Sequence, residues 1–141
     1  MRSSLSSPAE AEAAFYTAFR SLDILGMRQA WADLPGVYCV HPSGQLFVGY
    51  EPVMQSWSRI FQGADNPQLL HSLIAKSYHP EVVVHLVEER IGPAGSPYDS
   101  LSLVLATNQF VSTEDGWRML VHHASPVPSG ATATRFSTRM H

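Results

Sequence analysis

A chain of 141 residues, 45% of them hydrophobic and 15% charged, can build one hydrophobic core and is too apolar to remain disordered. A formal net charge of −3, with one lysine and scattered arginines, argues against a nucleic-acid module. The single cysteine, Cys39, excludes an intramolecular disulfide and favours a reducing compartment. Apolar runs are too short to span a bilayer, and no secretory signal follows Met1. We therefore expect a cytoplasmic protein with no nucleic-acid or membrane partner.

The first half of the chain carries three helix patterns. Ser7 and Glu10 can form a capping box around Pro8, which favours a helix start there. An apolar stripe at helical spacing continues this helix to Asp23. Two further helices are expected over residues 25–32 and 52–62.

The second half is rich in strand patterns. A short hairpin is predicted over residues 37–48, with turn chemistry at 42–45. Longer strands are expected over residues 69–78, 82–90, 101–112 and 117–125. Asp115-Gly116 is typical of a tight hairpin between the last two strands. Helices followed by an antiparallel meander predict an α+β fold, with three helices on one face of a curved, mainly antiparallel sheet.

No internal repeat or domain boundary is visible, so residues 1–126 are expected to form a single domain. After Pro126 the composition turns to Ser, Thr, Gly and Ala, with little to bury. Residues 127–141 are therefore expected to form a flexible C-terminal tail.

Three segments carry a family resemblance: Trp31 on the second predicted helix, residues 37–44 with their His41-Pro-Ser-Gly turn, and residues 116–126 with the His122-His123 pair. Together they resemble the SnoaL-like group of the nuclear-transport-factor-2-like (NTF2-like) superfamily, which includes ketosteroid isomerases and polyketide cyclases. The resemblance implies a cone-shaped α+β barrel, a ligand pocket between the helices and the concave sheet face, and a homodimer. It implies no particular reaction.

Both faces of the strand over residues 101–112 are apolar. One face carries Val104, Ala106, Asn108 and Phe110, and the other carries Leu101, Leu103, Leu105 and Thr107. An antiparallel strand with one solvated face would alternate with polar residues. We therefore expect a homodimer that covers the outer sheet face.

Three candidate catalytic residues come from the likeness to ketosteroid isomerase. His41 occupies the position of the general-base aspartate, and imidazole can accept a proton near neutral pH. Asn108 stands where that enzyme has an oxyanion-hole aspartate, and its amide can donate a hydrogen bond. Tyr16 lies near the matching tyrosine on the first helix. Both replacements of aspartate put isomerase activity in doubt, and core packing is the alternative role for Asn108 and Tyr16.

The adjacent histidines His122 and His123 must point to opposite faces of their strand, so they cannot chelate one metal ion together. Counting from the turn at Gly116 places His123 and Val121 on the pocket face and His122 on the outer face. A metal site from His41, His123 and Glu88 is conceivable, but no spacing demands one. We expect no metal and no cofactor.

Further ligand-binding candidates are the aromatic residues Trp31, Trp57 and Phe110, each of which core packing would also explain. Cys39 and His41 share a strand face, which permits a nucleophilic dyad, although a buried structural cysteine is the commoner case. The roles of His71, His79 and His85 are open.

These observations leave three hypotheses. The protein is an isomerase, cyclase or dehydratase that uses His41 as acid or base next to a carbonyl, a non-catalytic binder of a small organic molecule, or a dimeric interaction module of the same fold. A pocket at which His41 and Asn108 converge would favour the enzyme.

Overall fold

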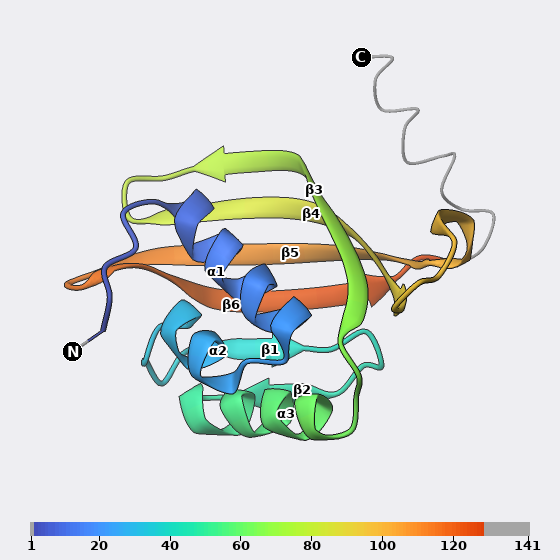
Figure 1. Ribbon diagram of the computed structural model, residues 1–141. Helices are drawn as coiled ribbons and strands as arrows, with labels where there is room; N and C mark the ends of the chain where they lie inside the picture. The colour runs from blue at the N-terminus through green and yellow to red at the C-terminus, as the bar shows by residue number, and fades with distance from the viewer. Residues whose placement is uncertain (1, 129–141) are drawn as a thin grey trace, which may run out of the picture.

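A six-stranded curved sheet and three helices make up the computed structural model of this protein, which describes residues 2–128 (Figure 1). The helices are α1 (Pro8–Ser21), α2 (Ile24–Ala30) and α3 (Tyr50–Gln62). The strands are β1 (Tyr38–Val40), β2 (Leu46–Val48), β3 (Pro67–Tyr78), β4 (Val82–Pro93), β5 (Ser102–Thr113) and β6 (Gly116–Pro126), with a 3₁₀ turn over Tyr98–Ser100. The expected α+β class and the order of elements are confirmed.

Helix α1 begins where the capping signals place it. The Ser7 side chain accepts a hydrogen bond from the Glu10 amide at 3.1 Å, and Pro8 occupies the first turn. Glu10 reaches back one residue further than a capping box would, because its carboxylate accepts from the backbone and hydroxyl of Ser6. The helix ends at Leu22, which adopts a left-handed conformation with φ of 53°.

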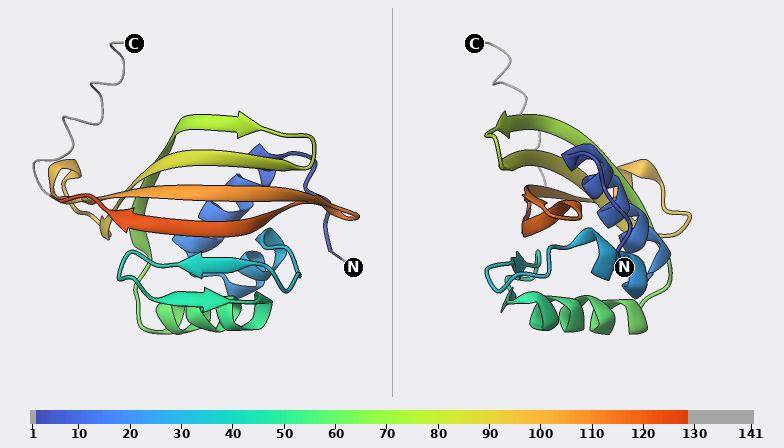
Figure 2. Two further views of the ribbon diagram at one scale, coloured as in Figure 1. Left: turned by 180° about the vertical axis from the view of Figure 1, so that it is seen from behind. Right: turned by 90° about the vertical axis from the view of Figure 1, so that its left-hand side faces the viewer.

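The strands follow the order β2-β1-β6-β5-β4-β3. All neighbouring pairs are antiparallel except β1 and β6, which run parallel. The long strands curve around the helices, and none of the helices of residues 2–128 lies on the opposite sheet face (Figure 2). The fold is therefore a two-layer structure with one covered and one uncovered sheet face, as in the cone-shaped NTF2-like fold.

Two bulges interrupt the sheet. Leu73 pairs with Val87 and Ala75 with Leu86, which leaves Ile74 as the extra residue in β3. In β6, Met119 pairs with Phe110 and Val121 with Gln109, so that Leu120 is extra. Each bulge reverses the face on which the following residues lie and increases the local twist of its strand.

Aromatic side chains join the helices to the sheet. Phe15 of α1 packs edge-on against Tyr16, Trp31 and Trp57, with ring centroids 4.8, 6.3 and 5.5 Å apart. All four are buried. Edge-to-face aromatic pairs add about 0.5–1.5 kcal/mol each beyond the burial of apolar area.

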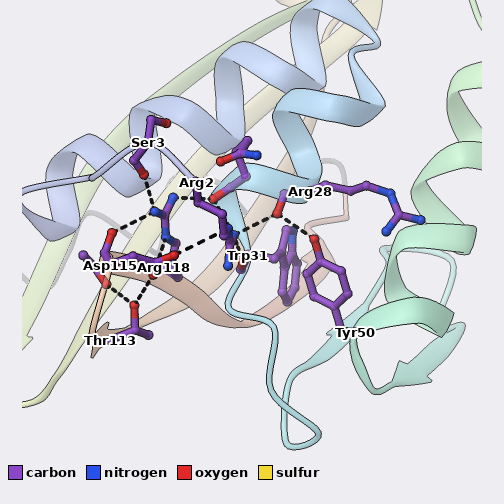
Figure 3. Close-up of polar contacts among 10 residues, drawn as sticks. Arg2, Ser3, Arg28, Trp31, Tyr50, Thr113, Asp115 and Arg118 are labelled. Atoms are coloured by element: carbon purple, nitrogen blue, oxygen red, sulfur yellow. Dashed lines mark hydrogen bonds and ion pairs between the residues drawn. The ribbon is translucent and has the colours of Figure 1, made fainter.

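Two arginines hold the carbonyl groups at the end of α2 (Figure 3). The Arg2 guanidinium donates to the carbonyl oxygens of Arg28 at 2.9 Å and Gln29 at 2.8 Å, and also to that of Trp31. Arg118 of β6 donates to the same Gln29 oxygen at 2.7 Å. The last carbonyls of a helix lack intrahelical partners and carry partial negative charge, so cationic donors stabilise this end.

The domain prediction for residues 1–126 stays an expectation. Within the predicted tail, Val127 is still tied to the sheet through its amide, which donates to the Leu103 carbonyl at 2.9 Å. Residues 129–141 lie outside the described residues. Within residues 2–128, none of the helices has the length and apolar character needed to cross a bilayer.

Gly116 offers a test of the β5–β6 turn. Its φ is +113°, and a Cβ added there would lie 2.6 Å from the Leu5 carbonyl oxygen. Gly116→Ala should therefore lower the free energy of unfolding by about 3 kcal/mol, through backbone strain and displacement of Leu5. Gly95→Ala is the matched control, because Gly95 has φ of +82° with open space around it, and should cost only about 1 kcal/mol. Urea denaturation measures both, and equal losses would contradict the close approach of Leu5.

Candidate functional site

A mostly apolar cavity of about 240 Å³ lies between the helices and the inner sheet face. Its lining residues are Phe19, His41, Pro42, Ser43, Trp57, Ile60, Glu89, Ile91, Val104 and His122. Three of them, His41, Glu89 and His122, have titratable side chains. The cavity adjoins an open groove of about 740 Å³ that shares Pro42, Ser43, Ile91 and Val104 with it. Of the predicted site residues, His41 and Trp57 line this cavity.

His41 stands directly after β1 with its ring buried against α3. Its Nε2 lies 2.9 Å from the Ser56 hydroxyl oxygen, and the Ser56 hydroxyl donates to the Val53 carbonyl at 2.7 Å. Since that proton is committed, Ser56 must accept from His41, which assigns the proton of the neutral ring to Nε2. Burial lowers the pKa of His41 to about 4. At neutral pH, His41 therefore carries its lone pair on Nδ1.

His122 lies on the inner face, and the predicted faces of His122, His123 and Val121 were wrong. The turn-anchored count missed the extra residue Leu120, which reverses the alternation before His122. His122 is buried beside Phe15 and Trp57, with ring centroids at 4.9 and 6.0 Å. Val121 pairs with Gln109 on the outer face, and His123 is exposed.

The tautomer of His122 follows from its partner. The Asn108 amide nitrogen donates to Glu12 and to Tyr16, so its oxygen must be the atom that faces His122. His122 Nδ1 lies 2.6 Å from that oxygen and therefore carries the proton, which leaves the lone pair on Nε2. Burial, with smaller contributions from His41 and His123, lowers the pKa of His122 to about 3.

Glu89 is the ionisable acid in the cavity wall, and the sequence analysis did not select it. The residue is 2% exposed, and burial raises the pKa of its carboxyl to about 7, with a smaller raising effect from Glu12. Tyr16 donates to Glu89 Oε2 at 2.6 Å and opposes that rise. Oε1 has no hydrogen-bond donor among the described residues. The spacing of Val83, Val87 and Glu89 on one strand face was the signal that could have found it.

A buried polar network stands behind the cavity. Asn108 donates to Glu12 Oε2 at 3.1 Å and to the Tyr16 hydroxyl at 3.0 Å, while Tyr16 donates to Glu89. Burial and the neighbouring carboxylate of Glu89 raise the pKa of Tyr16, so it remains a neutral donor. His85 Nδ1 lies 3.0 Å from Glu12 Oε1. Tyr16 and Asn108 are thus brought together, but neither lines the cavity.

The histidines without an assigned role now have positions. His71 stacks on Tyr16 with ring centroids 4.1 Å apart, and its Nδ1 lies 2.6 Å from the Arg20 guanidinium. Burial and Arg20 lower the pKa of His71. His85 belongs to the buried network through Glu12, and His79 is exposed in the turn between β3 and β4.

Two predicted ligand contacts lie away from the cavity. Trp31 is fully buried, and an isolated bridge joins its backbone to Met119 near the start of β6. Phe110 is also fully buried, with its ring 5.1 Å from that of His85. Trp31 and Phe110 therefore pack in the core, whereas Trp57 forms a cavity wall.

The described residues form neither the metal site nor the cysteine–histidine dyad that the sequence analysis considered. Within residues 2–128, no group of three His, Cys, Asp or Glu side chains is placed to hold a metal ion. His41 and His123 lie on opposite sides of the sheet. Cys39 Sγ lies 3.7 Å from His41 Nε2, which donates to Ser56, and 4.0 Å from Nδ1, which can accept at most a weak hydrogen bond from the thiol. Burial raises the pKa of the Cys39 thiol, which disfavours the thiolate that a nucleophile requires.

Comparison with known proteins gives a consistent set of relatives. The model of the SnoaL-like domain matches residues 9–129. A candidate calcium/calmodulin-dependent protein kinase type II association domain from Thiobacillus denitrificans is 30% identical, with a TM-score of 0.83 over 89% of this chain and 98% of that one. A candidate dehydratase of the NTF2-like family from Streptomyces avermitilis is also 30% identical, with a TM-score of 0.73 over 86% and 94%.

Two further relatives have lower sequence identity to this chain. A ketosteroid isomerase-like protein from Erwinia carotovora is 14% identical, with a TM-score of 0.67 over 85% of this chain and 93% of that one, and so shares the fold alone. The F-box protein SKIP8 of Arabidopsis thaliana is 27% identical over 111 residues. That match covers 79% of this chain and 46% of SKIP8, so the chain spans about half the length of this curated relative.

The raised pKa of Glu89 has a measurable effect on stability. The folded protein keeps a proton that an unfolded glutamate releases above pH 4.5, so the Glu89 contribution to stability falls as pH rises from 4.5 to about 7. Glu89→Gln should therefore gain about 2 kcal/mol in free energy of unfolding relative to wild type between pH 5 and pH 7.5. Urea denaturation at both pH values measures this difference.

The control for this prediction is Glu88→Gln on the opposite face of β4. The low pKa values of His41 and His122 act in the opposite direction, because the unfolded chain binds protons there between pH 4 and 6.5. Both imidazoles are present in the wild type and in both variants. Their contribution to the pH dependence therefore cancels when the free energies of unfolding of wild type and variant are subtracted. Parallel profiles for wild type and Glu89→Gln would show that the Glu89 carboxyl titrates normally.

Proposed function

Because this chain belongs to the SnoaL-like domain family, we propose that its cavity binds a small organic molecule and moves a proton on it next to a carbonyl group, as an isomerase, cyclase or dehydratase does. The observation that carries this proposal is the Glu89 carboxyl in the wall of an apolar cavity, with its pKa raised to about 7. A general acid or base works best when its pKa lies near the working pH.

Glu89 is equipped for both directions of proton transfer. Near neutral pH it is divided between the ionised and the protonated form, so it can take a proton from a carbon next to the carbonyl and return it at another atom. Tyr16 holds Oε2 by a hydrogen bond of 2.6 Å. Oε1 is then the oxygen that accepts the substrate proton.

His41 is the second proton-transfer candidate, as the sequence suggests. Its Nδ1 lone pair belongs to an imidazole that is neutral at neutral pH, and Ser56 fixes the ring by binding Nε2. His122, on the strand paired with β1, presents a similar neutral ring to the cavity. A lowered pKa makes both rings weaker bases than Glu89, so we assign them to orienting the substrate and to accepting a proton in transit.

Tyr16 and Asn108 act in this scheme as positioning residues and not as direct donors to the substrate. Tyr16 orients the Glu89 carboxyl, and Asn108 fixes the His122 ring through its Nδ1. The scheme needs no cofactor. The 30% identity to a candidate dehydratase supports the enzyme over a binder that performs no chemistry.

Proton exchange tests this proposal directly. A panel of open-chain, single-ring and fused-ring ketones is incubated with the protein in D₂O, and loss of the α-proton signal is followed by ¹H NMR. We expect the wild type to accelerate exchange on at least one ketone and Glu89→Gln to slow it at least about 100-fold, because general acid–base groups contribute that much.

Two further variants complete that experiment. Glu88→Gln, the same chemical change on the outer face, should exchange at the wild-type rate. His41→Ala should slow exchange less than Glu89→Gln does. Loss of exchange in His41→Ala with retention in Glu89→Gln would transfer the role of base to His41, and no exchange in wild type would remove the catalytic proposal.

A dimeric interaction module is the second candidate function. Within residues 2–128, the outer face of the sheet is not covered by a helix (Figure 2). Half-buried residues of its central strands on this face include Val84, Leu105 and Thr107. The relative from Thiobacillus denitrificans is described as an association domain. We therefore propose a homodimer through this outer face, compatible with an occupied cavity on the other side.

A cytoplasmic location also stays a prediction, based on the single cysteine.

A charge in the middle of the outer face tests the dimer. Thr107→Arg should convert a dimer to a monomer, because two guanidinium groups would be buried against each other. Thr17→Arg makes the same change on the exposed side of α1 and should leave the dimer intact. Size-exclusion chromatography with light scattering measures the mass. A monomeric wild type at tens of micromolar, or equal behaviour of the two variants, would count against this interface.

A further inference from the structure

We infer that the ligand of the Glu89 cavity is an uncharged, hydroxyl-bearing compound whose buried part is a single six-membered ring. This inference rests on the proposed function and names the class of molecule on which that function acts. Three independent features carry it: the volume of the cavity, the absence of a cationic group from its lining within the described part of the chain, and the orientation of its hydrogen-bonding atoms.

The volume limits the buried part of the ligand. A cavity of about 150 Å³ accommodates benzene, whereas drug-sized molecules occupy roughly 300–1,000 Å³. At about 240 Å³, this cavity takes one ring with small substituents. Phe19 and Trp57 pack edge-on with centroids 4.9 Å apart and fix its walls from the helix side. A rigid four-ring steroid exceeds this space.

The lining disfavours charged ligands. Among residues 2–128, neither a lysine nor an arginine lines the cavity, so a buried carboxylate or phosphate would lose its hydration without gaining a cationic partner from them. An ammonium group would require Glu89 to be fully ionised, which burial opposes. An uncharged molecule neither loses the hydration of a charge nor requires Glu89 to be ionised.

Three polar atoms of the cavity call for a hydrogen-bond donor on the ligand. The Trp57 indole N–H, which is buried without a partner among the described residues, is a donor and suits the carbonyl oxygen of the ligand. His41 uses its Nε2 proton on Ser56, and His122 uses its Nδ1 proton on Asn108. The nitrogen that remains on each ring is an acceptor, and His41 Nδ1 has only the weak donor Cys39 Sγ beside it at 4.0 Å. Glu89 Oε1 is a third acceptor when the carboxyl is ionised. A hydroxyl group satisfies such an acceptor, whereas a ligand without a donor leaves it unpaired.

The open groove provides the entrance. It meets the cavity at Ser43 and Val104, and Ser43 is exposed. Ile60 also lines the cavity, and its 38% exposure places it where the cavity opens to solvent. Substituents on the ring can extend into the groove, so the size limit applies to the part that reaches Glu89.

Isothermal titration with probes that share one six-membered ring tests the class. The probes are 2-hydroxycyclohexanone, cyclohexanone, cyclohexanecarboxylate and cyclohexylammonium, with a four-ring steroid ketone for size. We expect 2-hydroxycyclohexanone to bind about tenfold more tightly than cyclohexanone and at least tenfold more tightly than either ion. The steroid can insert only one of its four rings and should bind more weakly than 2-hydroxycyclohexanone. Ile60→Trp should weaken binding by narrowing the entrance. Leu25→Trp, at a 72% exposed site on α2, should not.

The outcomes separate this inference from the proposed function. Equal or tighter binding of the carboxylate, the ammonium or the steroid overturns the ligand class, and so does a panel in which no probe binds. When the binding panel overturns the ligand class but a ketone still shows Glu89-dependent exchange of its α-proton, the proposed function stands and only the ligand class is wrong. If exchange is absent as well, both fail.

Discussion

The side-chain amide of Asn108 connects the helical layer to the sheet at the centre of the polar core. Its nitrogen donates to Glu12 and Tyr16 of α1, and its oxygen accepts from His122 of β6. A buried polar group left without a partner costs about 1–3 kcal/mol, so loss of this amide would leave several groups unsatisfied at once. The tautomer of His122 and the position of the Tyr16 hydroxyl on Glu89 both depend on it.

This dependence explains why a largely apolar cavity can contain titratable groups in defined states. Burial alone would raise the pKa of a carboxyl and lower that of an imidazole, but it would not orient either of them. The hydrogen bonds behind the cavity orient the Glu89 carboxyl and the His122 ring. The aromatic packing of Phe15 and Trp57 excludes water from the His122 ring. Burial and orientation arise from different residues, so substitutions can alter them separately.

The sequence predicted the fold well because its signals are local. The cap at Ser7, the turn at Asp115-Gly116 and the alternation of the long strands each require only neighbouring residues. The site was predicted in part. His41 and Trp57 line the cavity, and Tyr16 and Asn108 meet behind it. Glu89 was missed because Glu88 and Glu89 are adjacent, and one acid of such a pair must face inward when Val83 and Val87 do.

The bulge at Leu120 determines which side chains of the last strand reach the interior. With the extra residue in place, His122, Ala124 and Pro126 share the inner face with Asn108, Ala106 and Val104. If β6 paired without the bulge, with Leu120 opposite Gln109, then Val121, His123 and Ser125 would face inward instead. A shift of one residue in the pairing of β6 thus separates two different cavity chemistries in the same sequence, one with an imidazole opposite Asn108 and one with the side chain of Val121 there.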